Sequence, residues 1–190
     1  LAVINHGSTG SGKDPTIAKL SWSSVTLANF LAERGYLVAF PFRRGRGKSD
    51  GLYDEGFSKN RANGYTCSTE KSLAGADRAL IDIEAAVRSL LKRSDVSQGK
   101  LLIGGVSRGG ILASAYAGLH PSEVSGVVNF VGGWIDDACE NVEKINGSLF
   151  LKAANYPRDM IWFYGHDDPF YSISHSKRNF AVFTEAGGIG

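Results

Sequence analysis

The stretch LLIGGVSRGGILASAYAGLH, residues 101–120, places a serine between an apolar run and a helix-like segment. The apolar run predicts a buried strand, and the residues after the serine predict a helix over 108–119. Between them, residues 105–109 fit the pattern G-x-S-x-G, which in a strand–turn–helix setting is typical of a nucleophilic serine. The sequence therefore predicts Ser107 as a nucleophile, and the alternative is an ordinary glycine-rich turn between a strand and a helix.

The chemistry of such a serine explains its neighbours. A sharp turn holds the residue in a strained backbone conformation, and small residues must flank it so that the adjacent chain does not clash. The helix that follows directs free N–H groups and the positive end of its dipole toward the serine oxygen, where negative charge develops during attack.

The rest of the chain alternates between short apolar runs and helical patterns. The runs predict strands at residues 1–5, 36–42, 100–106, 125–133 and 159–165. Apolar residues at steps of three and four predict helices at 23–34, 69–92, 108–119 and 172–186, with a weaker one at 139–154 that Gly147 breaks. This alternation is typical of an α/β protein with a doubly wound, mostly parallel sheet and helices on both faces.

Length and composition fit one domain spanning residues 1–190, with possible lid or loop insertions at 48–68 and 134–156. The net charge of +2 and the scattered basic residues give no reason to expect a nucleic acid or a membrane surface as partner. The chain begins inside an apolar strand without Met and closes on a glycine-rich loop. We therefore expect it to be incomplete at both ends.

The two cysteines, Cys67 and Cys139, lack the spacing of metal ligands and lie in polar surroundings. Two free thiols and one long-range disulfide both fit this pattern. A disulfide would favour export to an oxidising compartment, periplasmic or secreted.

Four segments together resemble the α/β-hydrolase fold, most closely its dienelactone-hydrolase-like and peptidase-like members. They are NHGSTG (5–10), RRGRGKSDG (43–51), GVSRGG (105–110) and YGHDDPFY (164–171), and the resemblance runs from Leu1 to about Ala186. It implies an oxyanion hole made by the backbone N–H groups of Ser8, with Gly7 or Thr9 as alternatives, and of Arg108. It also implies that His6 anchors a loop and is not the catalytic base.

The arginine-rich segment 43–51 resembles a structural loop of related esterases and peptidases. Arg43, Arg44 or Arg46 could instead pair with a carboxylate of the substrate. A phosphate-binding loop is excluded, because the pattern for one needs a preceding strand and a following helix, and Lys48-Ser49 has no helix after it.

The resemblance places the catalytic acid on the loop after the last predicted strand. The spacing G-x-x-D from Gly165 selects Asp168, with Asp167 as second choice, while a simple turn before Pro169 is the other interpretation. Asp136 and Asp137 are expected in a solvated loop, with the acid role as a lesser alternative.

No histidine lies where this fold places its base, which follows the acid by a helix and a strand. The four histidines are His6, His120, His166 and His175. We expect the base on a downstream segment outside this chain, with His175 or His166 as substitutes.

The resulting hypothesis is a serine hydrolase of small carboxylic esters or lactones that uses no metal or organic cofactor. An amidase or peptidase of the same fold is the nearest alternative, because the same triad performs both reactions. A ligand-binding protein of this fold without turnover is the alternative from a different class. The sequence leaves the oligomeric state open.

Overall fold

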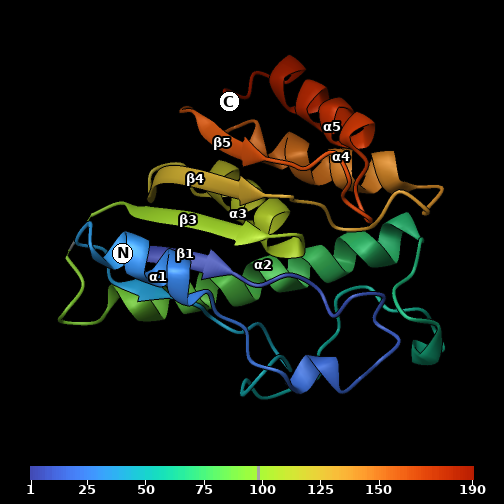
Figure 1. The fold of residues 1–190 in the computed structure, drawn as a ribbon, viewed down its shortest axis with the longest axis horizontal. Coiled ribbons are helices and arrows are strands. Elements are labelled where there is room, and N and C mark those ends of the chain that lie inside the picture. Colours follow the sequence, from blue (N-terminus) through green and yellow to red (C-terminus); the bar gives the residue numbers. More distant parts are fainter. Residues whose placement is uncertain (98) are drawn as a thin grey trace.

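The computed structural model describes residues 1–97 and 99–190. Its strands form one parallel sheet in the order β2–β1–β3–β4–β5 (Figure 1). The strands are β1 (Ala2–Asn5), β2 (Val38–Ala39), β3 (Leu101–Val106), β4 (Val124–Phe130) and β5 (Met160–Phe163). The predicted mostly parallel sheet is confirmed.

Helices cover both faces of this sheet, as predicted (Figure 1). They are α1 (Val25–Ala32), α2 (Thr69–Leu91), α3 (Arg108–Leu119), α4 (Val142–Ala153) and α5 (Ile173–Glu185), with short 3-10 helices at Ile17–Lys19 and Arg61–Asn63. Within residues 1–97 and 99–190, no helix combines the length and the apolar character needed to cross a membrane.

Strand β1 is apolar on both faces because each of its faces is covered. Val3 and Ile103 face the larger core, which α2, α3 and α4 complete, while Ala2 and Ile4 face a smaller cluster beneath α1. Successive strand residues point to opposite faces, so a strand covered on both sides needs an unbroken apolar run. The sequence of β1 meets this requirement.

Helix α2 presents the stripe predicted from its spacing. Ala76, Leu80, Ile83 and Val87 are buried in the larger core. The Ser68 side chain caps the first turn by accepting a hydrogen bond from the backbone N–H of Lys71.

Two predicted elements differ from the structure. The strand expected at 36–42 is reduced to the two residues of β2, which lies at the edge of the sheet and pairs with β1 alone. The break expected at Gly147 is absent, and α4 continues through that residue. Gly147 lies against α5, where an added Cβ would lie 3.9 Å from Val182 Cγ1.

The two segments considered as lids contribute to the core. Tyr53 and Glu55 of the first segment are 5% and 3% exposed, and Trp134 and Phe150 of the second are buried. These side chains hold both segments against the body of the molecule.

A disulfide joins Cys67, just before α2, to Cys139, just before α4, with 5.5 Å between the two Cα atoms. Of the two alternatives left open by the sequence, the long-range disulfide is therefore confirmed. It links segments that are 72 positions apart in the chain.

Reduction of this disulfide is expected to lower the free energy of unfolding by about 4 kcal/mol, because a closed loop of this length restricts the unfolded chain. Urea unfolding with and without a phosphine reductant measures the difference. A double Cys67→Ser/Cys139→Ser variant should match the reduced protein and should not respond to the reductant. An unchanged midpoint on reduction would contradict the prediction.

Candidate active site

Ser107 occupies the turn between β3 and α3 with φ 55° and ψ −122°. This positive φ is costly for a residue with a side chain. Four backbone hydrogen bonds hold it. Ser107 N–H donates to Phe130 O at 3.0 Å, and its carbonyl oxygen accepts from the N–H groups of Gly110, Ile111 and Gly133 at 2.9, 3.3 and 3.3 Å. The surrounding chain therefore maintains the strained turn expected of a nucleophilic serine.

The glycines around this serine are required by close packing. A Cβ on Gly105 would lie 2.4 Å from the carbonyl carbon of Gly109, and a Cβ on Gly109 would lie 2.1 Å from Asn5 O. A Cβ on Gly7 would lie 3.2 Å from the Ser107 Cβ. The start of α3 is thus packed directly against the end of β1, which brings Gly7 beside Ser107.

A cavity of about 420 Å³ opens over Ser107. Its aromatic lining consists of Trp22, Tyr65, Trp134, Phe170 and Tyr171. Its charged lining includes Lys13, Arg46 and Asp136. Ser8 and Arg108, the two predicted oxyanion residues, also line this cavity.

Tyr171 is a neighbour of the serine that the sequence analysis did not single out. Its hydroxyl lies 3.4 Å from Ser107 Oγ and donates a 2.8 Å hydrogen bond to Gly133 O. Burial raises the pKa of Tyr171 to about 12. The phenol therefore stays protonated near neutral pH and is not a general base for Ser107.

The backbone N–H groups of Ser8 and Arg108 have no protein acceptor within the described residues 1–97 and 99–190. Arg108 is the first residue of α3, where a helix leaves its N–H groups unpaired. Both groups are available to a ligand in the cavity.

His6 is held as a neutral loop anchor. Its Nδ1 donates to Gly7 O at 2.7 Å, and its Nε2 accepts from the Arg43 N–H at 3.2 Å, so both ring nitrogens are occupied. Burial, together with the charge of Arg43, lowers the pKa of His6 to about 3.

The three arginines of the 43–51 loop have different environments. Arg43 is buried against Glu55, and Arg44 donates from both Nε and Nη2 to Asp82 Oδ1. Arg46 is 5% exposed, lines the cavity and donates to Ile17 O. Of the three, Arg46 alone lines the cavity. If one of these arginines pairs with a carboxylate of the substrate, Arg46 is therefore the candidate.

Asp168 ends the turn after β5. Its Oδ1 accepts from Phe170 N at 2.8 Å and from Tyr171 N at 2.9 Å, and the side chain is half-buried. Asp168 therefore stabilises the turn, as the second interpretation of the sequence expected. Its Oδ2 remains able to accept a hydrogen bond from another donor. Asp167 is exposed.

Asp136 and Asp137 lie after β4. Asp136 lines the cavity, and its Oδ1 accepts from Ala138 N at 3.0 Å. Asp137 accepts from Ser172 N at 2.9 Å and lies 3.8 Å from His175 Nδ1.

His175 is buried between α4 and α5. Its Nε2 accepts hydrogen bonds from Asn146 Nδ2 at 3.0 Å and Asn179 Nδ2 at 2.8 Å, and burial lowers its pKa. His166 is exposed, and His120 stacks on Tyr116. All four histidines are described, and none lines the cavity with Ser107.

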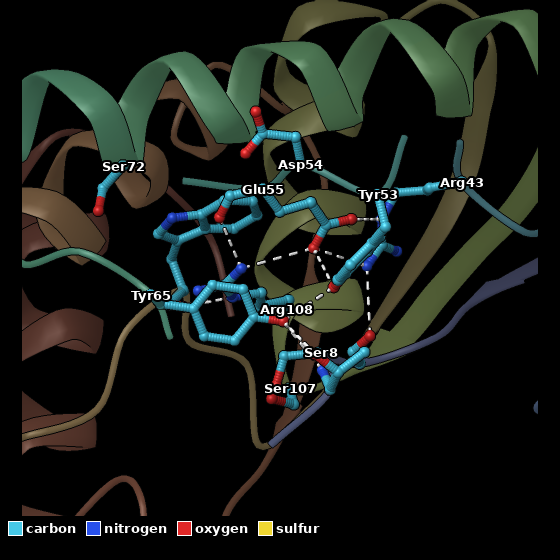
Figure 2. A network of polar contacts seen from close by, with 12 residues as sticks. Ser8, Arg43, Tyr53, Asp54, Glu55, Tyr65, Ser72, Ser107 and Arg108 are labelled. Carbon is cyan, nitrogen blue, oxygen red and sulfur yellow. Dashed lines mark hydrogen bonds and ion pairs between the residues drawn. The ribbon is translucent and has the colours of Figure 1, made fainter. Parts of the chain in front are cut away.

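A buried charge network lies behind the cavity (Figure 2). Glu55 contacts Arg43 Nε at 2.5 Å, the Tyr53 hydroxyl at 2.8 Å and Arg108 Nη1 at 3.6 Å. Burial would raise the pKa of Glu55, but the charge and hydrogen bonds of Arg43, followed by the charge of Arg108, outweigh it and lower the pKa to about 2. The carboxylate is therefore ionised under ordinary conditions.

These two pKa shifts predict that the protein loses stability in acid. His6 takes up a proton below pH 6.5 only when unfolded, so the free energy of unfolding falls as pH drops from 6.5 toward 3. The Glu55 contribution is present above about pH 4.5 and is lost as pH falls toward 2. Between pH 6.5 and 5, His6 alone should remove about 2 kcal/mol.

Urea unfolding at several pH values checks this expectation. His6→Gln should make the dependence between pH 6.5 and 5 shallower, with the lowered pKa of His175 accounting for part of what remains. The same change at the exposed His166 should leave the slope as in the wild type. If the free energy of unfolding of His6→Gln depends on pH as steeply as that of the wild type, His6 is not the source of this pH dependence.

A family model described as alpha/beta hydrolase fold matches residues 3–177, so the chain belongs to the α/β-hydrolase fold family. None of the curated proteins compared with the chain matches it. The closer likeness to dienelactone hydrolases and peptidases stays a prediction, because the match defines the family alone.

Solved structures share this fold at low sequence identity. The ferulic-acid complex of Est1E from Butyrivibrio proteoclasticus is 15% identical with a TM-score of 0.65, over 96% of this chain and 75% of that one. The esterase Pf2001 from Pyrococcus furiosus is 16% identical with a TM-score of 0.60, over 99% and 68%. Acetyl xylan esterase 1 from Thermoanaerobacterium sp. JW/SL YS485 is 20% identical with a TM-score of 0.59, over 95% and 64%.

Proposed function

We propose that the protein is a serine hydrolase of small carboxylic esters or lactones, with Ser107 as the nucleophile. The observation that supports this most is the strained turn at Ser107, which faces a cavity also lined by Ser8 and Arg108. Backbone strain persists only where the surrounding structure enforces it, and it is concentrated at functional sites. Membership of the α/β-hydrolase fold family supports the same reaction class.

In the proposed reaction, Ser107 Oγ attacks the carbonyl carbon and its proton passes to a base. The carbonyl oxygen becomes an oxyanion that accepts hydrogen bonds from the N–H groups of Ser8 and Arg108. The C–O bond to the leaving alcohol breaks as the base returns the proton to that oxygen. Water then hydrolyses the acyl-serine, which releases the acid and restores Ser107.

The proposed base is a histidine from outside these 190 residues, oriented by Asp168. Both backbone hydrogen bonds to Asp168 use Oδ1, so Oδ2 can accept the imidazole N–H. This contact would hold the tautomer and stabilise the imidazolium. Both ring nitrogens of His6 and the Nε2 of His175 are hydrogen-bonded within the protein, and neither histidine lines the cavity, which supports this assignment.

The cavity favours a small substrate with a flat or apolar acyl group. Its five aromatic side chains provide apolar walls, while Ser8, Ser107 and Arg108 supply polar groups at one point. Pockets of this size with a few convergent polar groups typically bind small molecules. The Est1E complex, which has this fold, holds ferulic acid.

Fluorophosphonate labelling with peptide mapping tests the nucleophile in these 190 residues and in the full-length protein. We expect Ser107 to be labelled in the full-length protein and not in the shorter chain. Labelling in both would assign the base to a histidine within the 190 residues. No labelling of the folded full-length protein would overturn the proposal in favour of a ligand-binding role.

The substrate class is tested by comparing an ester and an amide that share one aromatic acyl group. We expect kcat/KM for the ester to exceed that for the amide. A preference for the amide would instead assign the amidase or peptidase reaction to the same residues.

A further inference from the structure

The buried Arg43–Glu55 pair lies directly behind the peptide bond that joins Gly7 to Ser8. Gly7 O accepts a 2.7 Å hydrogen bond from His6 Nδ1 and a 3.3 Å hydrogen bond from Arg43 Nη2. Both donors are buried, so the carbonyl of this peptide points into the protein. In a trans peptide the N–H is directed opposite to the C=O. The structure contains no cis peptide among its described residues, so the Ser8 N–H points toward the cavity.

Arg43 is held in one orientation by its remaining donors. Its Nη1 donates to His6 O at 2.9 Å, and its Nε and Nη2 contact the two Glu55 oxygens at 2.5 and 3.3 Å. A planar guanidinium engaged in this way on its three nitrogens has little freedom to turn. Arg43 therefore transmits the position of Glu55 to the Gly7–Ser8 peptide.

The same carboxylate also lies beside the side chain of Arg108, the residue whose backbone N–H is the second proposed oxyanion donor. Arg108 Nη1 lies 3.6 Å from Glu55 Oε2 and donates to Glu55 O at 2.8 Å, while Arg108 Nε donates to Trp134 O at 2.7 Å. The guanidinium lies between the rings of Tyr65 and Trp134, at 3.5 and 4.2 Å from their centroids. Figure 2 shows Glu55 between the two arginines, and Ser8 and Ser107, which both line the cavity, on the other side of Arg108 in this view.

We infer that Arg43 and Glu55 are positioning residues for the oxyanion hole, which they hold through the Gly7–Ser8 peptide and the Arg108 side chain. The inference rests on the proposed function. Two buried guanidinium groups face one carboxylate, so a net positive charge lies behind both donors. Hydrogen bonds to Gly7 O also polarise the same peptide and strengthen its N–H as a donor.

The test compares kcat and KM of the wild-type full-length protein and of its Arg43→Lys variant with an ester substrate. The substitution keeps the positive charge and removes the planar guanidinium. We expect kcat to fall about 10- to 100-fold, because a displaced donor loses contact with the oxyanion. KM should stay within about threefold of the wild type, since the ground state needs this contact less. Affinity for a boronic acid that forms a tetrahedral adduct should fall in parallel with kcat.

Arg44→Lys is the matched control. Arg44 belongs to the same loop and also pairs with a carboxylate, since its Nε and Nη2 donate to Asp82 Oδ1 at 2.8 and 2.6 Å. Among the described residues it has no contact with Gly7 or Glu55. Both kcat and boronate affinity should remain near the wild-type values in this variant. A folded Arg43→Lys protein with unchanged kcat, or an equal loss in Arg44→Lys, would overturn the inference alone. Absence of turnover and of Ser107 labelling in the wild type would overturn the proposed function and this inference with it.

If Arg43→Lys does not fold, Glu55→Gln provides the second variant, for which we expect the same fall in kcat with little change in KM.

A measurement on the wild type completes the test. Boronate adduct formation should shift the amide proton resonances of Ser8 and Arg108 downfield, as expected for donors to an oxyanion. Unshifted Ser8 and Arg108 amides in the adduct would overturn the inference.

Discussion

Ser107→Ala is expected to lower kcat of the full-length protein about 10⁴-fold or more and to abolish fluorophosphonate labelling. Removal of a serine nucleophile leaves only the contribution of the oxyanion hole and of substrate binding. The variant should fold, because the hydrogen bonds that hold this turn use the backbone N–H and carbonyl of residue 107. Among the described residues, the hydrogen-bond contact of its side chain is the one with the Tyr171 hydroxyl, at 3.4 Å.

Ser89→Ala is the control for this variant. Ser89 is exposed on α2, so its removal should change neither turnover nor labelling. Circular dichroism and thermal unfolding of both variants confirm that the fold is kept. A folded Ser107→Ala protein with wild-type turnover would show that another residue is the nucleophile.

Gly109→Ala is expected to have the largest effect on stability, with a loss on the order of 5 kcal/mol or a failure to fold. The new Cβ would lie 2.1 Å from Asn5 O, a backbone atom that no change of rotamer can move. Relief of this overlap requires α3 to move away from β1, which would also displace Gly7 and the turn at Ser107. Urea unfolding measures the loss of stability.

The same substitution at Gly147 is the matched control, because both glycines lie inside helices. An added Cβ at Gly147 would meet only Val182 Cγ1, at an ordinary contact distance of 3.9 Å. Gly147→Ala should therefore stabilise the protein by about 0.5 to 1 kcal/mol through helix propensity. Equal effects at the two positions would contradict the packing argument.

The sequence alone predicted the elements whose residues follow a regular period. The spacing of Ala76, Leu80, Ile83 and Val87 predicted α2 to within a residue at its end, and residues 108–119 matched α3. These predictions succeeded because the period of buried residues reflects the geometry of a helix. The strand at 36–42 was predicted too long. Its apolar residues continue beyond Val38–Ala39, but in this edge strand those flanking residues do not pair with β1.

The candidate site was predictable only where a local motif carries its chemistry. The G-x-S-x-G pattern predicted the sharp turn at Ser107, because its glycines are needed within the same turn. Tyr171 and Glu55 were missed, since one comes from the loop after β5 and the other from a loop 52 residues before the serine. Their approach to the site depends on sheet order and loop path, which leave no local signal in the chain.

The sequence by itself thus determined the alternation of strands and helices and the turn at Ser107, because these depend on residues close together in the chain. The tertiary structure decided that Cys67 and Cys139 pair, that His6 and His175 are engaged in the core, and that Arg43 pairs with Glu55. In each case the distance in space between the residues is set by how the helices, loops and sheet pack, and the sequence carries no local signal of it. A buried ion pair such as Arg43–Glu55 forms only when folding brings both charges together out of water.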